Sequence, residues 1–177
     1  MINKYSCINI YENKKKNSKL SSQILYGEKF TILKRYKDWY KIKTSYDKYI
    51  GFIKKKKFES CVFKPTHKVS SLKAKVFLKP YKTSKVKTKL SFTSLIQVKS
   101  SNNGFFNFDN YWIQKSNVVP LSYKEKIFQR IKIFRNVKYK WGGKRFDGVD
   151  CSGLIQLFYK FNNLYCPRDT GPQFKYF

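Results

Sequence analysis

A change of hydrophobic pattern at Pro120 is the feature that most restricts the fold of this chain. Before this residue, short clusters of β-branched and aromatic residues are separated by turn-like segments such as Lys37-Asp38. After it, apolar residues recur at helical spacing. The sequence therefore predicts small all-β units followed by a helical segment.

The β-rich part divides into two stretches of similar size. In the first, the β-forming clusters are Phe30–Ile32, Trp39–Ile42 and Tyr49–Phe52. The pattern returns more loosely from Ala74, after a short polar joint at Pro65–Lys73. Short strands at close spacing are typical of a small barrel or sandwich. We therefore predict two such units, which are candidate repeats.

A first helix is predicted after Pro120. Ser122 and Glu125 match the capping box, in which a serine caps the first turn and a glutamate three residues later returns to its amide. One apolar stripe follows at i, i+4 and i+7, formed by Ile127, Ile131 and Phe134. This helix is expected to end near residue 136.

Cys151 stands directly before a second helical pattern, between Asp150 and Ser152. A thiol attacks acyl carbon only as the thiolate, and the unpaired amides and the dipole of a helix N-terminus favour that anion. The pattern is therefore compatible with a nucleophile. It is equally compatible with a small buried cysteine in a tight turn, and spacing alone leaves both interpretations open.

The net charge of +29 has two interpretations. One is a polyanionic partner, such as nucleic acid or a cell-wall polymer. The other is compositional drift in an AT-rich genome, because only five of the 39 basic residues are arginine and Asn, Ile, Tyr and Phe are plentiful. The sequence contains no aromatic RNA-binding motif and no helix-turn-helix pattern. We expect salt-sensitive, non-specific binding to polyanions and no specific nucleic acid.

Targeting and metal signals are missing from the sequence. The first residues contain no apolar signal-peptide core, and no window approaches the ~18 apolar residues of a membrane span. A cytoplasmic protein without a membrane span is therefore expected. The cysteines lack metal-ligand spacing, so we predict reduced thiols and neither metal nor cofactor. These cysteines are Cys7, Cys61, Cys151 and Cys166.

Three segments resemble the NlpC-type family of papain-like cell-wall cysteine peptidases. They are Y-x-W-G-G at Tyr139–Gly143, G-x-D-C-S-G-L-I-Q at Gly148–Gln156, and P-R-D-T-x-x-Q at Pro167–Gln173. The preceding part resembles bacterial SH3-like domains, most visibly in SSQILYGE (Ser21–Glu28) and DKYIGFI (Asp47–Ile53). The resemblance is strong over residues 139 to 173 and weaker before them.

The resemblance implies a multidomain α+β fold. Two small SH3-like β-barrels, at residues 1–66 and 67–120, are expected to precede the helical N-terminal part of a papain-like α+β catalytic domain at 121–177. In this family the first SH3-like domain narrows the site, so that only stem peptides with a free amine enter.

The implied activity is hydrolysis of the γ-D-glutamyl–diaminopimelate bond in peptidoglycan stem peptides. Cys151 is the implied nucleophile, and its backbone amide contributes to an oxyanion hole. Asp150 is expected to bind the free amine of an N-terminal L-Ala, since a carboxylate and an ammonium make a strong charge-assisted contact. Further substrate contacts are expected from the motif residues Ser152, Tyr139 and Trp141.

Three other residues are candidates for contact with substrate. Glu28 and Tyr49 are candidates for the residues that narrow the site, although Glu28 is also compatible with a turn carboxylate and Tyr49 with a core ring. Arg168 could steer an acidic peptide, or pair with Asp169 or with a backbone carbonyl. Each of these alternatives stays open at the level of sequence.

The sequence departs from the family at the catalytic base. The family supplies a histidine downstream of the cysteine, whereas the single histidine here is His67, expected to be a solvated residue of the joint. Two amphipathic helices without a sheet also make a marginal core. We therefore expect a C-terminally truncated catalytic domain that is inactive as this chain. The alternative is a non-catalytic module that binds muropeptide or wall polymer.

Overall fold

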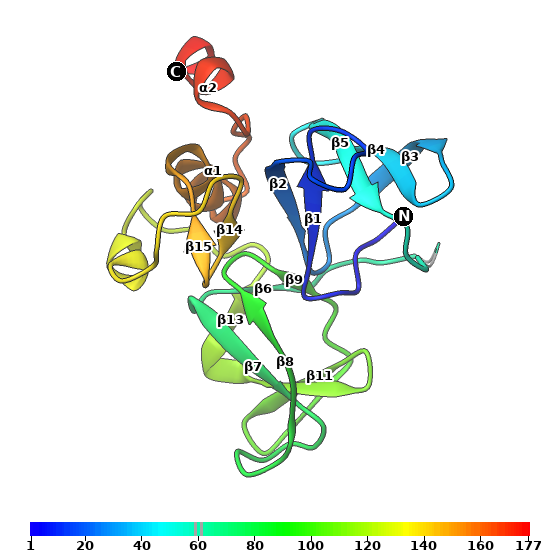
Figure 1. Ribbon diagram of the computed structural model, residues 1–177. Helices are drawn as coiled ribbons and strands as arrows, with labels where there is room; N and C mark the ends of the chain where they lie inside the picture. Colours follow the sequence, from blue (N-terminus) through cyan, green and yellow to red (C-terminus); the bar gives the residue numbers. More distant parts are fainter. Residues whose placement is uncertain (59, 61) are drawn as a thin grey trace.

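Figure 1 shows the computed structural model, which describes residues 1–58, 60 and 62–177. The chain is mostly β, with two α-helices, α1 (Cys151–Phe161) and α2 (Thr170–Tyr176). No helix of the described residues is long and apolar enough to cross a membrane. The predicted thiol of Cys61 lies outside the described residues, and the other three cysteines are free.

The first sheet contains five antiparallel strands in the order β2-β1-β5-β4-β3. Alternate residues face its core, so that Ile10, Ile42 and Ile53 are fully buried. The β-rich clusters predicted between residues 30 and 52 are therefore confirmed as strands. The strands are β1 (Cys7–Tyr11), β2 (Leu20–Leu25), β3 (Phe30–Arg35), β4 (Trp39–Thr44) and β5 (Ile50–Lys54).

A second five-stranded sheet, in the order β10-β11-β12-β7-β8, lies below the first in Figure 1. Its β11–β12 turn contains Asp109 and Asn110, both at positive φ, a conformation that these two residue types tolerate well. The strands are β7 (Lys73–Phe77), β8 (Val86–Ser91), β10 (Ser100–Asn102), β11 (Phe105–Phe108) and β12 (Tyr111–Gln114).

The segment predicted to be a solvated joint contains a strand instead. His67 opens β6 (His67–Val69), which pairs with β9 (Leu95–Ile96) and β13 (Val118–Pro120). Its half-buried ring lies against Phe106. The prediction for His67 was wrong because the joint supplies backbone partners to two distant strands. Each sheet is formed within one of the three predicted ranges, but the boundaries themselves stay a prediction.

The helix predicted from Ser122 is absent. Residues 121–122 and 127–130 form turns with irregular backbone between them, and only the short 3-10 helix η2 (Ile131–Phe134) follows. A second 3-10 helix, η1 (Lys115–Asn117), lies earlier in the chain. The Glu125 carboxylate accepts hydrogen bonds from Arg130 and Tyr123 rather than from the Ser122 amide. Phe128, at φ 67°, also interrupts any regular helix at this point.

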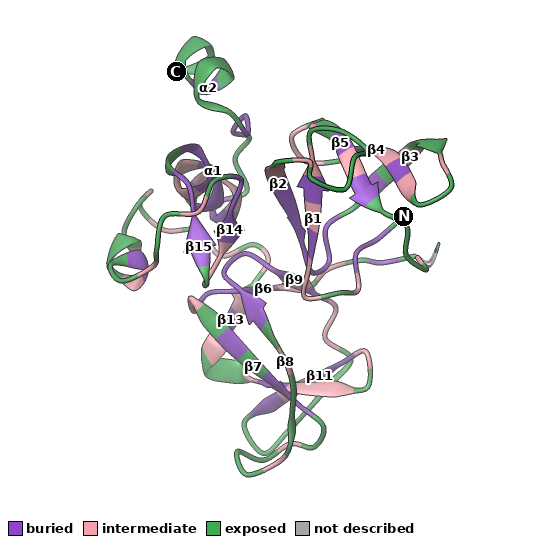
Figure 2. Ribbon diagram, in the orientation of Figure 1, coloured by how far each residue is buried: buried purple, intermediate pink, exposed green. Residues whose placement is uncertain are grey.

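Helix α1 confirms the second helical pattern and packs on all parts of the chain. Its buried face, which includes Phe158 and Phe161, contacts Leu25 of β2, Phe92 after β8 and Phe134 of η2. Figure 2 shows this buried core between the two sheets and the helix. The apolar stripe of α1 therefore does not lack a partner, contrary to the expectation from sequence.

Two buried charged contacts attach α1 to the sheets. Lys68 of β6, only 1% exposed, donates to the carbonyl of Phe161 at the last residue of α1 and to that of Tyr123, with its Nζ 2.6 Å from the latter. On the first sheet, Glu28 accepts a hydrogen bond from Lys160 of α1. Both β units thus contact the helix through buried charged groups.

The Glu28 carboxylate sits between two ammonium groups. Burial opposes its ionisation, but Lys144 and Lys160 outweigh burial and lower the pKa of Glu28. Nearby, Asp47 accepts a hydrogen bond from Gln156 of α1 at 2.8 Å. Because Glu28 faces two buried ammonium groups, removing its carboxylate leaves uncompensated charge in the interior.

We expect Glu28→Gln to lower the free energy of unfolding by about 3–5 kcal/mol, because Lys160 then remains buried without an anion. Chemical denaturation measures this loss. Asp38→Asn, in the exposed β3–β4 turn, is the control and should change stability by less than about 0.5 kcal/mol. Equal losses in the two variants would show that Glu28 contributes only net charge.

The Glu28 carboxylate should make the stability of the fold depend on pH. Since the folded-state pKa of Glu28 lies below its ordinary value of 4.5, its contribution is complete above that value. The contribution is lost as the pH falls through the lower folded-state pKa. The difference in unfolding free energy between the natural chain and Glu28→Gln should therefore shrink on acidification, and a constant difference from pH 7 to pH 3 contradicts the linkage.

Candidate active site

Cys151 is the first residue of α1, and its side chain is exposed. The hairpin of β14 (Lys144–Arg145) and β15 (Gly148–Val149) brings the chain to Asp150, which caps the helix with extended backbone angles. The chain thus turns sharply from a strand into the helix, and the turn presents the sulfur at the helix N-terminus.

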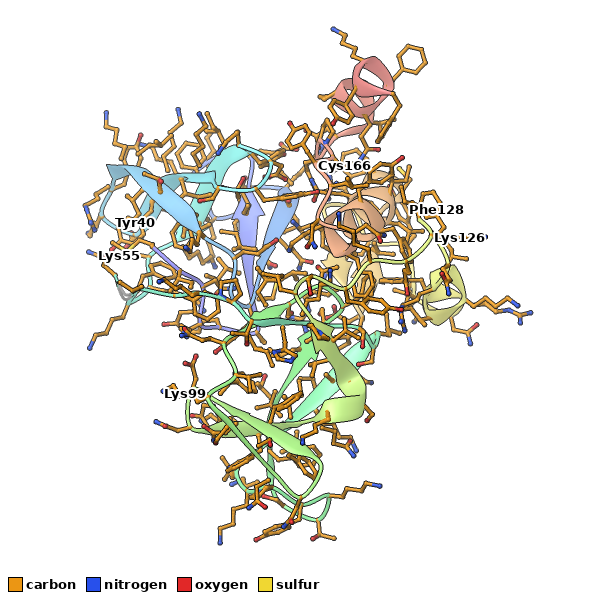
Figure 3. All side chains as sticks on the ribbon, turned by 180° about the vertical axis from the view of Figure 1, so that it is seen from behind. Tyr40, Lys55, Lys99, Lys126, Phe128 and Cys166 are labelled. Atoms are coloured by element: carbon orange, nitrogen blue, oxygen red, sulfur yellow. The ribbon has the colours of Figure 1, made fainter. Side chains whose placement is uncertain are left out.

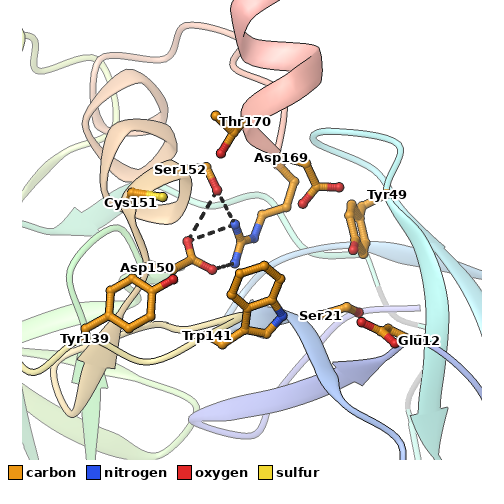
Figure 4. Close-up of a pocket in the computed structure, with 11 residues that line it drawn as sticks. Glu12, Ser21, Tyr49, Tyr139, Trp141, Asp150, Cys151, Ser152, Asp169 and Thr170 are labelled. Carbon is orange, nitrogen blue, oxygen red and sulfur yellow. Dashed lines mark hydrogen bonds and ion pairs between the residues drawn. The ribbon is translucent and has the colours of Figure 1, made fainter.

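The sulfur faces a cavity of about 330 Å³. Figure 4 shows Cys151 and Tyr139 on one side of it and Glu12 and Tyr49 on the other, with Trp141 between them. The first sheet and α1 therefore build the cavity together. The residues that line it are Glu12, Ser21, Tyr49, Tyr139, Trp141, Asp150, Cys151, Ser152, Arg168, Asp169 and Thr170.

The carboxylate of Asp150 is fully occupied by the protein. Its oxygens accept from the backbone N–H groups of Gly153 at 2.7 Å and Gly142 at 2.8 Å, and from both Nη atoms of Arg168 at 3.0 and 2.6 Å. The Ser152 hydroxyl lies at 3.4 Å. A carboxylate offers about four lone-pair sites, and contacts within the protein use them. The contact of Asp150 with a substrate amine stays a prediction.

Arg168 is held on Asp150 rather than on any predicted partner. It is 3% exposed, and it also donates to the hydroxyls of Ser22 at 3.0 Å and Ser152 at 2.9 Å. The pairing with Asp169 or a backbone carbonyl that the sequence left open is not seen. Four of its five N–H groups have partners among the described residues, and one remains for the cavity that Arg168 lines.

Glycines in the motif allow the close approach of these groups. A Cβ on Gly153 would lie 2.7 Å from both Asp150 Oδ1 and the carbonyl oxygen of Gly143. Gly142 has φ +71°, and a Cβ there would meet the backbone of Leu20 at 2.9 Å. The Gly-Gly and Cys-Ser-Gly segments are therefore required for Asp150 to receive its backbone hydrogen bonds.

Two acids that were not predicted as substrate contacts lie in the cavity. Glu12 directly follows β1, and Asp169 precedes α2. Burial raises the pKa of Asp169 and outweighs the nearby Arg168, and its side chain makes no cap to α2. Nothing in the spacing of the sequence indicates that Glu12 faces Cys151, because 139 residues separate them and only the packing of β1 near α1 brings them together.

The other predicted residues divide between the cavity and the interior. Tyr139 and Trp141 line the cavity and are both 65% exposed. Tyr49 lines it too while packing partly on the first core, so both interpretations of Tyr49 fit. Glu28 lies outside it, in its contacts with Lys160 and Lys144. The substrate contact of Glu28 stays a prediction.

No histidine lines the cavity within the part of the chain that the structure describes. His67 lies in β6, with Nδ1 3.0 Å from the hydroxyl of Thr66. Of the described cysteines, Cys7 and Cys166 have a pKa raised to about 11 by burial, whereas Cys151 is exposed. Cys151 is thus the exposed thiol among the described cysteines.

We expect Asp150→Asn to cost about 3–5 kcal/mol of stability in thermal or chemical unfolding. Asparagine keeps the helix cap, so the loss measures the charge that neutralises buried Arg168. Asp169→Asn is the matched control in the same cavity and should leave stability almost unchanged, since its side chain makes no cap. A stable Asp150→Asn variant would show that Arg168 does not need this anion.

Comparison with known proteins gives two family matches. Residues 10–58 match the bacterial dipeptidyl-peptidase Sh3 domain, and residues 136–177 match the NlpC/P60 family. The γ-D-glutamyl-L-lysine dipeptidyl-peptidase of Bacillus subtilis (strain 168) is 30% identical over 175 residues, which cover 88% of this chain and 58% of the relative. The protein of the same name from Bacillus cereus (strain ATCC 10987 / NRS 248) is 24% identical, over 88% of this chain and 54% of the relative.

The chain thus spans about half the length of these curated relatives. Its fold is similar to the crystal structure of an NlpC/P60 family protein from Bacillus cereus ATCC 10987, with a TM-score of 0.82 and 17% identity over 97% of this chain and 75% of the other. Motifs, fold and family matches agree. Residues 136–177 are therefore similar to the NlpC/P60 family, and they are preceded by a segment that matches the bacterial dipeptidyl-peptidase Sh3 domain.

Proposed function

We propose that this chain binds peptidoglycan stem peptides as part of a cysteine peptidase that cleaves after γ-D-glutamate, at the bond to diaminopimelate. The observation that carries the proposal is the exposed Cys151 at the start of α1, in one cavity with Asp169 and with Glu12, which follows β1 of the first sheet. The names of the two Bacillus relatives support γ-D-glutamyl peptides as the substrate class. We place this binding in the cytoplasm, the compartment that the sequence predicts.

The reaction follows from the position of the thiol. The Cys151 thiolate attacks the γ-carbonyl carbon, and the carbonyl electron pair moves to oxygen to give a tetrahedral oxyanion. Unpaired N–H groups at the start of α1, that of Cys151 included, stabilise this charge. Collapse breaks the C–N bond and expels the next residue as an amine, which takes up the proton that the thiol released, and water then hydrolyses the acyl-enzyme. The proton acceptor that generates the thiolate lies outside the residues that line this cavity.

Recognition of the free amine falls to Glu12 and Asp169 in this proposal. Both carboxylates line the cavity, whereas Asp150 is saturated by Arg168 and backbone amides. Arg168 keeps one N–H group for the α-carboxylate of the glutamyl residue. Glu12 belongs to the first sheet, so that sheet takes part in substrate selection.

A second candidate function is favoured by the absence of histidine among the residues that line the cavity. This chain would then hold the peptide without cleaving it, as a muropeptide-binding module. Both functions share the same peptide contacts and differ only in turnover. We expect negligible turnover by the 177-residue chain, because a cysteine nucleophile needs a base.

Calorimetry with L-Ala-γ-D-Glu-diaminopimelate tests the binding site. We expect N-acetylation of the peptide, or Glu12→Gln, to weaken binding about tenfold or more, because each removes one partner of a charge-assisted contact. Lys82→Gln, far along the chain in an exposed loop, is the control for changed charge. Equal affinity for free and acetylated peptides would contradict recognition of the amine.

Product analysis by mass spectrometry separates the two functions. Negligible cleavage together with tight binding is the expected outcome. Cleavage that disappears in Cys151→Ala would show that the chain needs no histidine beside the thiol, and would reject the binding-only alternative. Binding itself should survive Cys151→Ala, because the proposed peptide contacts come from other side chains.

A further inference from the structure

We propose that the outward face of the first sheet binds single-stranded nucleic acid without sequence preference, independently of the Cys151 cavity. Alternation along the strands separates this face from the core, because Tyr40, Ile42 and Ile53 are buried while their neighbours point outward. Four half-buried rings lie on it: Tyr11, Tyr36, Trp39 and Phe52. Four lysines accompany these rings, namely Lys14, Lys34, Lys41 and Lys54. The four rings and the four lysines together form what we call the aromatic–lysine face.

Strand register places rings and cations in one row. Tyr11 of β1 lies opposite Phe52 of β5, and Phe52 lies opposite Lys41 of β4. Lys41 in turn lies opposite Lys34 of β3. With strands roughly 4.8 Å apart, this row crosses four strands, with two rings followed by two lysines. An extended ligand that lies along it meets both kinds of group.

The rings and ammonium groups are already in contact with one another. The Tyr11 and Trp39 rings meet edge to face, with centroids 5.5 Å apart. The Nζ atom of Lys14 lies 4.0 Å from the centroid of Tyr36, and that of Lys34 lies 5.7 Å from it. Cation and ring are therefore close enough for one ligand unit to engage both.

The described acids of this unit leave the positive charge of the face largely uncompensated. Glu28 and Asp47 are committed to contacts with α1, and Glu12 lines the Cys151 cavity. Asp38, in the exposed β3–β4 turn, is the acid that borders the face. Among the described residues, no ion pair involves Lys34, Lys41 or Lys54. Figure 3 shows many nitrogen-tipped side chains projecting from this part of the molecule, near Lys55 and Tyr40.

The chemistry of the face selects the ligand. A neutral glycan leaves the lysines without partners, and a polyanion without rings leaves the aromatic residues without partners. Single-stranded nucleic acid supplies both, because its bases stack on aromatic side chains and its phosphates attract lysine. Lysine acts as a point charge and lacks the planar fork of arginine, so the face is expected to bind without reading sequence.

Fluorescence anisotropy with a labelled oligothymidylate tests the proposal. The matched ligand is an abasic phosphodiester oligomer of the same length and charge. We expect the abasic oligomer to bind the full chain at least about fivefold more weakly, since each stacked base contributes to affinity. Equal affinity, or tighter binding of a base-free wall polymer such as poly(glycerol phosphate), would overturn the proposal.

Paired lysine variants locate the binding surface. Lys34→Gln with Lys41→Gln should reduce the slope of log K against log salt by about 1.4, since each phosphate contact contributes ~0.7 for a single strand. Lys82→Gln with Lys85→Gln removes the same charge from an exposed loop and should leave the slope unchanged. Phe52→Leu should weaken binding without altering the slope. Equal slope changes in the two lysine pairs would show that only net charge acts.

Discussion

The buried contact of Asp150 with Arg168 determines the geometry of the cavity. The Asp150 carboxylate caps α1 and accepts hydrogen bonds from the backbone N–H groups of Gly142 and Gly153. It also neutralises the guanidinium of Arg168, which is 3% exposed. Arg168 extends the contact to Ser22 of the first sheet at 3.0 Å. The N-terminus of α1 is therefore held relative to both its own hairpin and the neighbouring sheet. Because Cys151 directly follows Asp150, this contact also fixes the position of Cys151.

The opposite end and the side of α1 are held by other units in the same manner. Lys68 of β6 donates to the carbonyl of Phe161, and Glu28 pairs with Lys160. Between them the helix packs on Leu25, on Phe92 and on η2. Short β units of this size have little core of their own, so a shared core around one helix stabilises all three parts at once. The cavity is a consequence of this arrangement, since its walls come from the first sheet and from α1.

Periodic patterns predicted some of the regular elements. The clusters around Ile32, Ile42 and Phe52 became β3, β4 and β5, and the helical pattern directly after Cys151 became α1. The predicted capping box at Ser122 is not formed, because Arg130 and Tyr123 donate to the Glu125 carboxylate. The backbone N–H of Glu125 donates to Oδ1 of Asn162 at 2.8 Å. Local propensity was overridden there by partners that are distant in sequence.

Local sequence by itself determined the turn into α1, because glycines, a capping acid and a cysteine that must act together are adjacent in the chain. It also identified Tyr139 and Trp141, which the same segment carries to the cavity. Only the tertiary structure decided that Asp150 faces Arg168, that Glu28 faces Lys160, and that Glu12 and Asp169 remain in the cavity. The physical reason is that the partner of a buried charge is chosen by packing across the chain, and no local spacing encodes it.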